Sequence, residues 1–304
     1  MMTLDLQVNG FAGVDFNSDD LTAESLHHAC AEARKHGAHQ FLATVITDDL
    51  DAMARRLARM AALREEDALV REVIVGFHVE GPFLNETPGY IGAHPAQHAQ
   101  EASVEATKRL LHAAQGLVRL VTLAPERDPG LKTTAFLAAQ GIVVSAGHCD
   151  PTLDELRAAA DAGLTMFTHV GNGCPMTLHR HDNIIQRALS LADRLWLCFI
   201  ADGAHIPFFT LRNYLRGAGV KRCLCVTDAI SAAGLGAGRY RLGAREIDIG
   251  ADLIAWGPNK AHLVGSTVTM TRTARNLAEL GFTAAEVEML TAGNPRRALG
   301  LDPA

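Results

Sequence analysis

Eight short apolar runs alternate with helix-like segments along the 304-residue chain, and this alternation restricts the possible folds more than any other feature. Several runs are continuous in Val, Ile and Leu, which is typical of parallel strands buried on both faces. Strands that alternate with helices predict a parallel α/β sheet, and eight of them predict a closed (β/α)₈ TIM barrel. The expected strands are Leu4–Asn9, Gln40–Thr47, Val73–Val79, Val118–Ala124, Ile142–Ala146, Leu164–Thr168, Leu195–Ile200 and Arg222–Thr227.

The segments between these strands carry helix start and stop signals. Thr152 and Glu155, for example, have the spacing of a capping box at the start of a helix. A doubly wound open sheet is the alternative fold, but no GxGxxG follows the first strand, which weakens a dinucleotide-binding version of it. The expected helices run from Thr22 to Gly37, from Asp51 to about Glu65, from Ser103 to Gly116 and from Thr152 to Gly163.

The pattern changes after the eighth strand. The stretch from Tyr240 to Ala261 is typical of a hairpin and loop, and helices are expected from Ser266 to Leu280 and from Thr283 to about Leu290. The chain has no linker rich in Pro, Gly or Ser and no repeat of fixed period. We therefore expect residues 1–304 to form a single barrel domain, in which about 240–304 supply the hairpin and the C-terminal helices.

The composition is that of a globular protein with a full core, since 48% of the residues are hydrophobic and 20% are charged. The net charge of −6 gives no bulk attraction for nucleic acid or anionic lipid, so neither is an expected partner. The sequence contains no recognisable signal peptide or membrane-spanning run. The six cysteines form no CxxC pair, which favours reduced thiols and a cytoplasmic location.

Polar residues able to do chemistry follow the predicted strands at their carboxyl ends. In a barrel these ends surround one mouth, so residues far apart in the sequence converge there. Glu80, His148 and His169 can together bind Zn²⁺ and leave a position open, while Asp228 can move a proton. Such an ion would lower the pKa of a water molecule and polarise a carbonyl group. The strand-end residues are Gln7, Asn9, Glu80, Glu126, His148, His169, Asp202, His205 and Asp228.

Each of these residues also has a structural interpretation. A single His after a strand is more often a hydrogen-bonded structural residue, a single Asp is usually a helix cap, and Glu80 alone would be a surface or salt-bridge residue. The joint occurrence of acid, His, His and Asp at four strand ends favours a metal-dependent hydrolase. We expect one divalent ion, with Zn²⁺ preferred and Fe²⁺ or another divalent ion as the alternative.

Three further features stay open on the residues alone. His78 shares a strand face with Glu80, where it either supports the site or packs in the core. The basic run His179-Arg180-His181 either binds an anion or forms a solvated loop. Ser266 is a good cap for the helix expected after it, and the free amide groups at that helix start could also bind an anion.

Six sequence motifs contain Glu80, His148, His169, His205, Asp228 and Ser266, one in each. They lie between the first-strand stretch Asp5–Gly10 and the last-helix stretch Asn294–Leu301. Their order and spacing resemble those of the N-acetylglucosamine-6-phosphate deacetylases of the amidohydrolase superfamily, over nearly the whole chain from Asp5 to Leu301. The motifs are His78-Val79-Glu80-Gly81-Pro82-Phe83, Ser145-Ala146-Gly147-His148, Thr168-His169-Val170-Gly171-Asn172, Ile200-Ala201-Asp202-Gly203-Ala204-His205, Val226-Thr227-Asp228-Ala229 and Gly265-Ser266-Thr267-Val268-Thr269-Met270.

The resemblance implies roles for individual residues. Glu80, His148 and His169 match the family's metal ligands, and Asp228 matches its catalytic acid/base. His94, in Gly92-Ala93-His94-Pro95, matches a histidine that contacts the substrate and helps to polarise the acyl oxygen. The resemblance thus implies a metal-dependent hydrolase that removes an acetyl group from an N-acetylated amino sugar.

The resemblance also implies a phosphate-binding set, in which the arginine suits the planar recognition of a phosphate group. Gln7 and Asn9 stand where many amidohydrolases have a His-x-His pair, and amides are poorer metal ligands, so a single-metal site is implied. Gln7 and His78 are the candidates for supporting positions beside the ligands. The residues matched to substrate binding are Asn172, Gly173, Arg180 and His205.

The expected reaction converts N-acetylglucosamine 6-phosphate into glucosamine 6-phosphate and acetate, in an enzyme that is expected to be a homodimer. The chain departs from the family in the loop from Gly171 to Asn183, where it reads Asn-Gly-Cys for Asn-Ala-Met and Arg-His-Asp-Asn for Arg-Glu-Pro-Gly. Two alternatives therefore stay open: an amidohydrolase for a different small N-acyl or cyclic amide, and a non-catalytic sugar-phosphate-binding barrel. The family's small β-sandwich domain is expected to be missing.

Overall fold

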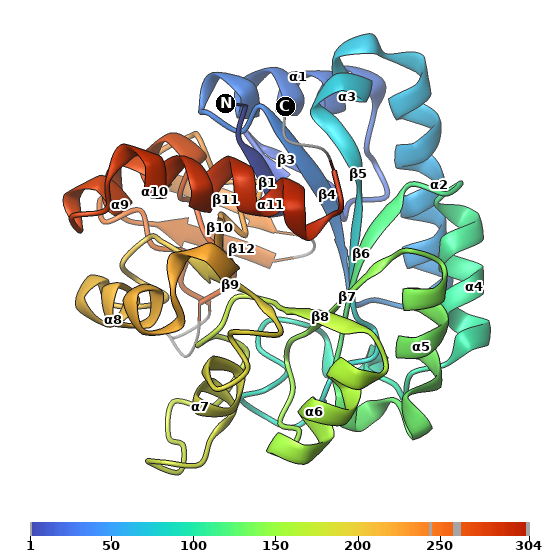
Figure 1. Ribbon diagram of the computed structural model, residues 1–304. Coiled ribbons are helices and arrows are strands. Elements are labelled where there is room, and N and C mark those ends of the chain that lie inside the picture. The colour runs from blue at the N-terminus through green and yellow to red at the C-terminus, as the bar shows by residue number, and fades with distance from the viewer. Residues whose placement is uncertain (1, 243–244, 258–262, 302–304) are drawn as a thin grey trace.

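The centre of the protein is one eight-stranded parallel sheet. The computed structural model describes residues 2–242, 245–257 and 263–301. The strands run in the order β1-β4-β5-β6-β7-β8-β9-β10, and helices enclose them (Figure 1). All eight predicted strands are therefore confirmed. They span β1 Leu4–Val8, β4 Gln40–Ile46, β5 Ile74–Glu80, β6 Val118–Leu123, β7 Val143–Ala146, β8 Leu164–Phe167, β9 Trp196–Ile200 and β10 Cys223–Val226.

The sheet closes where β1 meets β10 and the segment after it. Val8 forms a parallel bridge with Ala229, whose carbonyl also accepts the backbone N–H of Asn9 at 2.7 Å. Further along the seam the Asp5 side chain makes the connection. It accepts the backbone N–H of Thr227 at 3.1 Å and the Thr227 hydroxyl at 2.6 Å. This closure confirms the predicted TIM barrel, and the doubly wound open sheet is wrong.

The outer helices begin at the capping residues that the sequence indicates. Thr22 caps α1 together with Ser25, Ser103 caps α4, and Thr152 and Glu155 form the predicted capping box of α6. A short hairpin of β2 (Gly10–Phe11) and β3 (Val14–Asp15) follows β1. The helices between the strands are α1 Ala23–Lys35, α2 Leu50–Glu66, α3 Ala68–Val73, α4 Val104–Ala113, α5 Lys132–Ala139, α6 Leu153–Asp161, α7 Ile184–Leu189 and α8 Phe208–Ala218.

The C-terminal region differs from the prediction at one helix start. Helix α9 spans Met270–Glu279, and Thr269 is its N-cap. Ser266 instead forms a parallel bridge with Ala229, so its backbone is extended and the helix cannot begin there. The predicted cap and amide site at Ser266 are therefore wrong. The chain then continues through α10 Ala284–Glu288, a π-helical turn Met289–Gly293 and α11 Asn294–Ala298.

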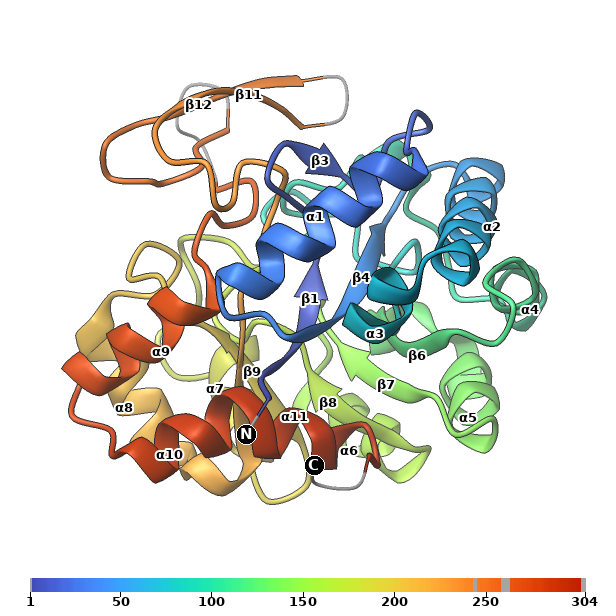
Figure 2. The same ribbon diagram turned by 90° about the horizontal axis from the view of Figure 1, so that it is seen from above.

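The predicted hairpin after the eighth strand is confirmed as β11 Gly238–Leu242 and β12 Arg245–Ile249. Residues 243–244 and 258–261 of the predicted stretch lie outside the described residues. Ile247 and Ile249 pack with Ile230, and Ala93 lies against the same cluster. The base of the hairpin thus adjoins the segment that carries His94, while its strands project from the barrel (Figure 2).

Two apolar layers hold the barrel together. One fills its interior and includes Leu6 and Ile200, and the other packs the strands against the helices. The cysteines Cys198, Cys223 and Cys225 are buried in these layers, and all six cysteines are free thiols, as expected. None of the described helices combines the length and apolar character needed to cross a bilayer.

Candidate metal centre and active site

Tight turns at the strand ends carry most of the predicted site residues. Glu80 is the last residue of β5, whereas His148, His169 and Asp228 follow the ends of β7, β8 and β10. The backbone φ angles of these three are 51°, 28° and 51°, which is the left-handed region. Non-glycine residues in that region cost about 1–3 kcal/mol each and cluster at functional sites. Local strain is thus concentrated at three of the four residues assigned to the chemistry.

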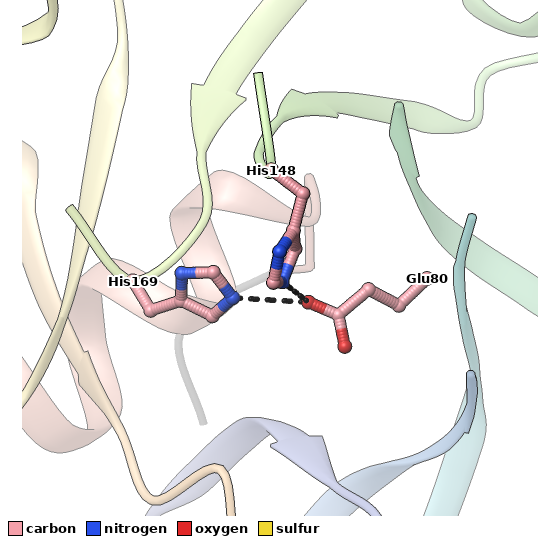
Figure 3. Close-up of side chains that lie close together, drawn as sticks. All are labelled: Glu80, His148 and His169. Carbon is pink, nitrogen blue, oxygen red and sulfur yellow. Dashed lines mark hydrogen bonds and ion pairs between the residues drawn. The ribbon is translucent and has the colours of Figure 1, made fainter. Parts of the chain in front are cut away.

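Glu80, His148 and His169 converge on one point, as Figure 3 shows. The Oε1 atom of Glu80 lies 3.1 Å from the Nε2 atom of His169 and 3.5 Å from the Nε2 atom of His148. The three possible ligand atoms all lie within 4.8 Å of one another, and all three residues are buried. The structure therefore brings together the three residues predicted from separate strands.

This donor set fits a divalent metal ion. The Nδ1 atom of His148 lies 2.8 Å from the carbonyl oxygen of Tyr90, which can only accept, so Nδ1 carries a proton and Nε2 is the ring nitrogen that faces the centre. Burial raises the pKa of Glu80, but hydrogen bonds with His148 and His169 outweigh it and hold that pKa well below its usual value. One carboxylate and two imidazoles are the ligand types of a catalytic zinc site with an open position.

Asp228 lies at the same mouth and is oriented by its neighbours. The Nδ2 group of Asn9 donates to Oδ1 of Asp228 at 2.7 Å. Thr227, the preceding residue, is fixed by hydrogen bonds from its backbone N–H and its hydroxyl to Asp5. Burial, reinforced by the charge of Glu80, raises the pKa of Asp228 to about 6. A carboxyl group with a pKa near neutrality can both accept and return a proton.

His94 joins the centre from the loop after β5. Its Nε2 atom lies 3.8 Å from Oε2 of Glu80, and its ring packs edge-on against His148 with 4.4 Å between the ring centroids. Burial, helped by the charge of His148, lowers the pKa of His94 to about 3, so its ring is neutral near pH 7. The buried Nδ1 atom of His94 has no hydrogen-bond partner in the described structure. A neutral imidazole of this kind can donate one hydrogen bond to an incoming oxygen.

The two supporting candidates behave differently. Gln7 donates from Nε2 to Oε1 of Glu80 at 3.0 Å, so it touches a residue of the metal centre. His78 instead bonds to the Thr122 hydroxyl at 2.8 Å, within a buried layer of hydroxyl groups. Burial lowers the pKa of His78 to about 4 and keeps it neutral. Among the described residues, His78 makes no hydrogen bond to the three residues of the centre, which favours its core-packing interpretation.

The residues matched to substrate binding lie at different distances from the centre. Asn172 donates to the carbonyl oxygen of His169 at 3.2 Å. Gly173 has a φ of 61°, and a Cβ atom there would lie 2.8 Å from Nδ1 of His148, so only glycine fits. The Nδ1 atom of His205 lies 2.6 Å from Oδ2 of Asp202. The positive charge of His205 lowers the pKa of Asp228. These three residues therefore surround the centre.

Arg180 is placed differently from these three residues. Its side chain is exposed on the loop before α7, and no hydrogen bond or ion pair to it is found within the described ranges. His179, beside it, accepts the backbone N–H of Asp182 at 2.9 Å. The basic run is thus a solvated loop in this structure, with an arginine free to meet an anion.

Two residues of the site are not indicated by the sequence analysis. Asp5 is fully buried within an apolar strand, and its partner Thr227 is far away in the sequence, so no local pattern marks the pair. Tyr90 acts through its backbone carbonyl, which any residue could supply. Glu126, a predicted strand-end carboxylate, has a structural role, because it accepts the Asp150 backbone N–H at 2.6 Å and an Asn85 amide N–H at 3.0 Å.

Comparison with known proteins finds relatives that are deacetylases of amino sugar phosphates, although no protein-family profile matches the chain. The chain is 31% identical to the N-acetylgalactosamine-6-phosphate deacetylase of Escherichia coli O157:H7, over 98% of this chain and 77% of that protein. It is 32% identical to the N-acetylglucosamine-6-phosphate deacetylase of Bos taurus, over 98% of this chain and 74% of that protein.

A solved structure agrees with this result. The structure of a mutant N-acetyl-D-glucosamine-6-phosphate deacetylase from Mycobacterium smegmatis, in complex with N-acetyl-D-glucosamine-6-phosphate, matches with a TM-score of 0.88 and 31% identity. The match covers 99% of this chain and 78% of that chain. The chain therefore belongs to the N-acetylglucosamine-6-phosphate deacetylase family, which is part of the amidohydrolase superfamily, and it is a hydrolase of carbon–nitrogen bonds other than peptide bonds.

Proposed function

We propose that the protein removes the acetyl group from N-acetylglucosamine 6-phosphate and releases acetate and glucosamine 6-phosphate. The observation that carries this proposal is the convergence of Glu80, His148 and His169 beside a carboxyl group, Asp228, whose pKa is raised to about 6. The names of the relatives support the choice of substrate. We further propose that residues 1–304 form a single catalytic domain, which acts as a cytoplasmic homodimer.

In this proposal Glu80, His148 and His169 hold one divalent cation, with Zn²⁺ as the preferred ion and Fe²⁺ as the alternative. When bound, the cation polarises the amide carbonyl and lowers the pKa of a water molecule. The ionised Asp228 takes a proton from the attacking water and returns it to the leaving nitrogen. Neutral His94 donates a hydrogen bond to the acyl oxygen, on which negative charge develops.

The phosphate group is assigned to Arg180, His205, Asn172 and Gly173. Arg180 has no carboxylate partner in the described part of the chain, so its planar donor fork is free to bind a phosphate in two-point fashion. Asn172 and Gly173 belong to the same loop as Arg180, at the end where the loop adjoins His169 and His148 of the metal centre. The substrate would thus span from the loop to the centre.

The Arg180→Gln variant should raise the KM for N-acetylglucosamine 6-phosphate by on the order of tenfold or more, because one charge-assisted contact is lost. Its kcat/KM for plain N-acetylglucosamine should stay at the wild-type value. Steady-state kinetics on both sugars measure this. The control is Arg157→Gln, which removes an exposed arginine that pairs with Asp154 on α6. Equal wild-type rates on the phosphorylated and plain sugars would rule out the assigned phosphate site.

The loop from Gly171 to Asn183 favours a second candidate substrate. It departs from the family's usual sequence, and one relative is named for the galactosamine epimer of the substrate. N-acetylgalactosamine 6-phosphate is therefore the first alternative, followed by other small N-acyl and cyclic amides. Acetate release from the two epimers, measured side by side, separates these candidates. A higher kcat/KM for the galactosamine epimer would show that this epimer is the preferred substrate. The proposed deacetylation chemistry would be unchanged.

A non-catalytic sugar-phosphate-binding barrel is the alternative of a different class. The observations against this role are the strained turns and the raised pKa of Asp228, because a binding protein has no need of a proton-transfer group. Metal analysis and an acetate assay on the same sample decide between them. A metal-free protein that still binds the sugar phosphate and releases no acetate would favour the binding role.

The pH profile should depend on Asn9. Asp228 must be ionised to accept a proton, so kcat/KM should fall as the pH drops through its pKa, which burial raises to about 6 and which a bound cation lowers. The Asn9 amide donates to Asp228 and favours the charged form. In Asn9→Ala the pKa of Asp228 rises, and the acid limb should move upward by roughly 0.5–1 pH unit.

The matched control for this profile is Asn85→Ala. Asn85 also donates from its amide to a carboxylate, but that carboxylate belongs to Glu126, outside the metal centre. The acid limb of kcat/KM in the Asn85→Ala variant should coincide with that of the wild type. If Asn9→Ala lowers the plateau and leaves the acid limb in place, the amide does not tune Asp228 and this part of the account fails.

A further inference from the structure

A groove of about 310 Å³ lies at the opposite end of the barrel from the metal centre. Its walls come from the first residues of β4, β5 and β6 and from the end of the chain around α11, whereas the centre lies at the last residues of the same strands. Figure 1 shows α11 beside the starts of the barrel strands. The residues that line the groove are Gln40, Val75, Arg119, Arg296, Leu299 and Leu301.

Arg296 is buried in this groove without an anionic partner. The residue is only 6% exposed, and among the described residues its guanidinium group donates one hydrogen bond, from Nη2 to the neutral Oε1 of Gln40 at 2.6 Å. Its Nε group has no partner, and no carboxylate within the described ranges forms an ion pair with it. A guanidinium group stays charged in a protein, and buried charges are normally paired. The described part of the groove therefore contains a buried guanidinium group that no described carboxylate neutralises.

Arg119 supplies a second unpaired guanidinium group on the same groove. Its side chain is exposed and makes no ion pair or hydrogen bond with any residue that the structure describes. Its stem lies over Gly76 of β5, where a Cβ atom would come within 2.5 Å of the Arg119 Cγ atom. The absence of a side chain at Gly76 thus makes room for this arginine against the sheet.

We propose that this groove binds a small organic oxyanion, a phosphate monoester or a carboxylate, whose charged end contacts Arg119 and Arg296. The aliphatic side chains of Val75, Leu299 and Leu301 line the same groove and receive the uncharged end of the ligand. A volume of about 310 Å³ suits a small ligand. The proposal uses none of the residues of the catalytic centre, so it stands or falls independently of the proposed reaction.

Calorimetric titration of the full chain with phenyl phosphate, benzoate and inorganic phosphate tests the site. Because the groove has an apolar wall, one of the two aromatic anions should bind at least several-fold more tightly than inorganic phosphate. Tighter binding of phenyl phosphate identifies a phosphate ligand, and tighter binding of benzoate identifies a carboxylate ligand. The Arg119→Gln variant should weaken this binding by on the order of tenfold.

A phosphate monoester could also bind at the proposed catalytic site, and the Arg180→Gln variant separates the two sites. It should keep the wild-type affinity for the aromatic anion that binds best. If Arg180→Gln removes the binding while Arg119→Gln retains it, the anion sits at the catalytic mouth and the groove proposal is overturned. The absence of saturable binding of any of the three anions at millimolar concentration also overturns it.

The Arg296→Met variant distinguishes a ligand site from a structural arginine. In anion-free buffer its Tm should stay close to that of the wild type, because it loses an unpaired buried charge and keeps most of the side-chain volume. The preferred anion should raise the Tm of the wild type and leave the Tm of Arg296→Met unchanged. A large loss of Tm in anion-free buffer, with no effect of the anion on the wild type, would make Arg296 purely structural and overturn the proposal.

Discussion

The Asp228→Asn variant should lose turnover of N-acetylglucosamine 6-phosphate by on the order of 10²-fold or more, because an amide cannot accept the proton. Its metal content should remain that of the wild type, since Asp228 is not one of the three converging ligand residues. The substitution keeps the size of the side chain and its place beside Asn9. Steady-state kinetics and elemental analysis of the same preparation measure both quantities.

The matched control for this variant is Glu126→Gln. Glu126 is also a largely buried carboxyl group that follows a barrel strand, but it bonds to the Asp150 backbone and to Asn85. The turnover of the Glu126→Gln variant should stay within a few-fold of the wild-type value. Near-normal turnover in Asp228→Asn would remove the proton-transfer role from this residue and with it the proposed mechanism.

Replacement of a residue of the metal centre should have a different signature. In Glu80→Gln the only anionic ligand is lost, so the bound metal should fall from about one ion per chain to nearly none. We expect turnover to fall by on the order of 10²-fold or more, since the electrostatic help of the cation is lost. His148→Asn should behave in the same way, because it removes one of the two imidazoles.

The control for these two variants is His98→Asn. His98 is partly exposed, its Nε2 atom lies 3.5 Å from Oδ1 of Asp48, and it is not one of the three converging residues. This variant should retain both metal and turnover. Full metal content in Glu80→Gln and in His148→Asn would mean that the ion binds elsewhere. If Glu80→Gln loses turnover but keeps its full metal content, Glu80 contributes to catalysis without being a metal ligand.

The barrel could be predicted because its strands are buried on both faces and therefore appear as continuous apolar runs. The helix starts of α1, α4 and α6 could be predicted because capping depends on residues only three apart. The start of α9 could not, because Ser266 pairs with Ala229, a residue remote in the sequence. Tertiary pairing there overrides a good local cap.

The convergence of Glu80, His148 and His169 could be predicted because the carboxyl ends of barrel strands share one mouth. The hydrogen bond from Asn9 to Asp228 could not, because it joins the two sides of the barrel seam. The Asp5–Thr227 pair and the lack of a described ion-pair partner for Arg296 could not be predicted either. A sequence shows which residues are charged or polar, but it does not show which distant residue contacts them. The bond from His78 to Thr122, which lies on the next strand, favours core packing over a supporting role, and a sequence cannot show that partner either.

The most direct test is a metal titration of the chelated, metal-free protein, followed by acetate release from N-acetylglucosamine 6-phosphate. Activity should rise linearly with added Zn²⁺ or Fe²⁺ and reach its plateau at one ion per chain, because Glu80, His148 and His169 form one set of ligands. Full acetate release by the metal-free protein, or a plateau at two ions per chain, would contradict a single metal centre built from these three residues.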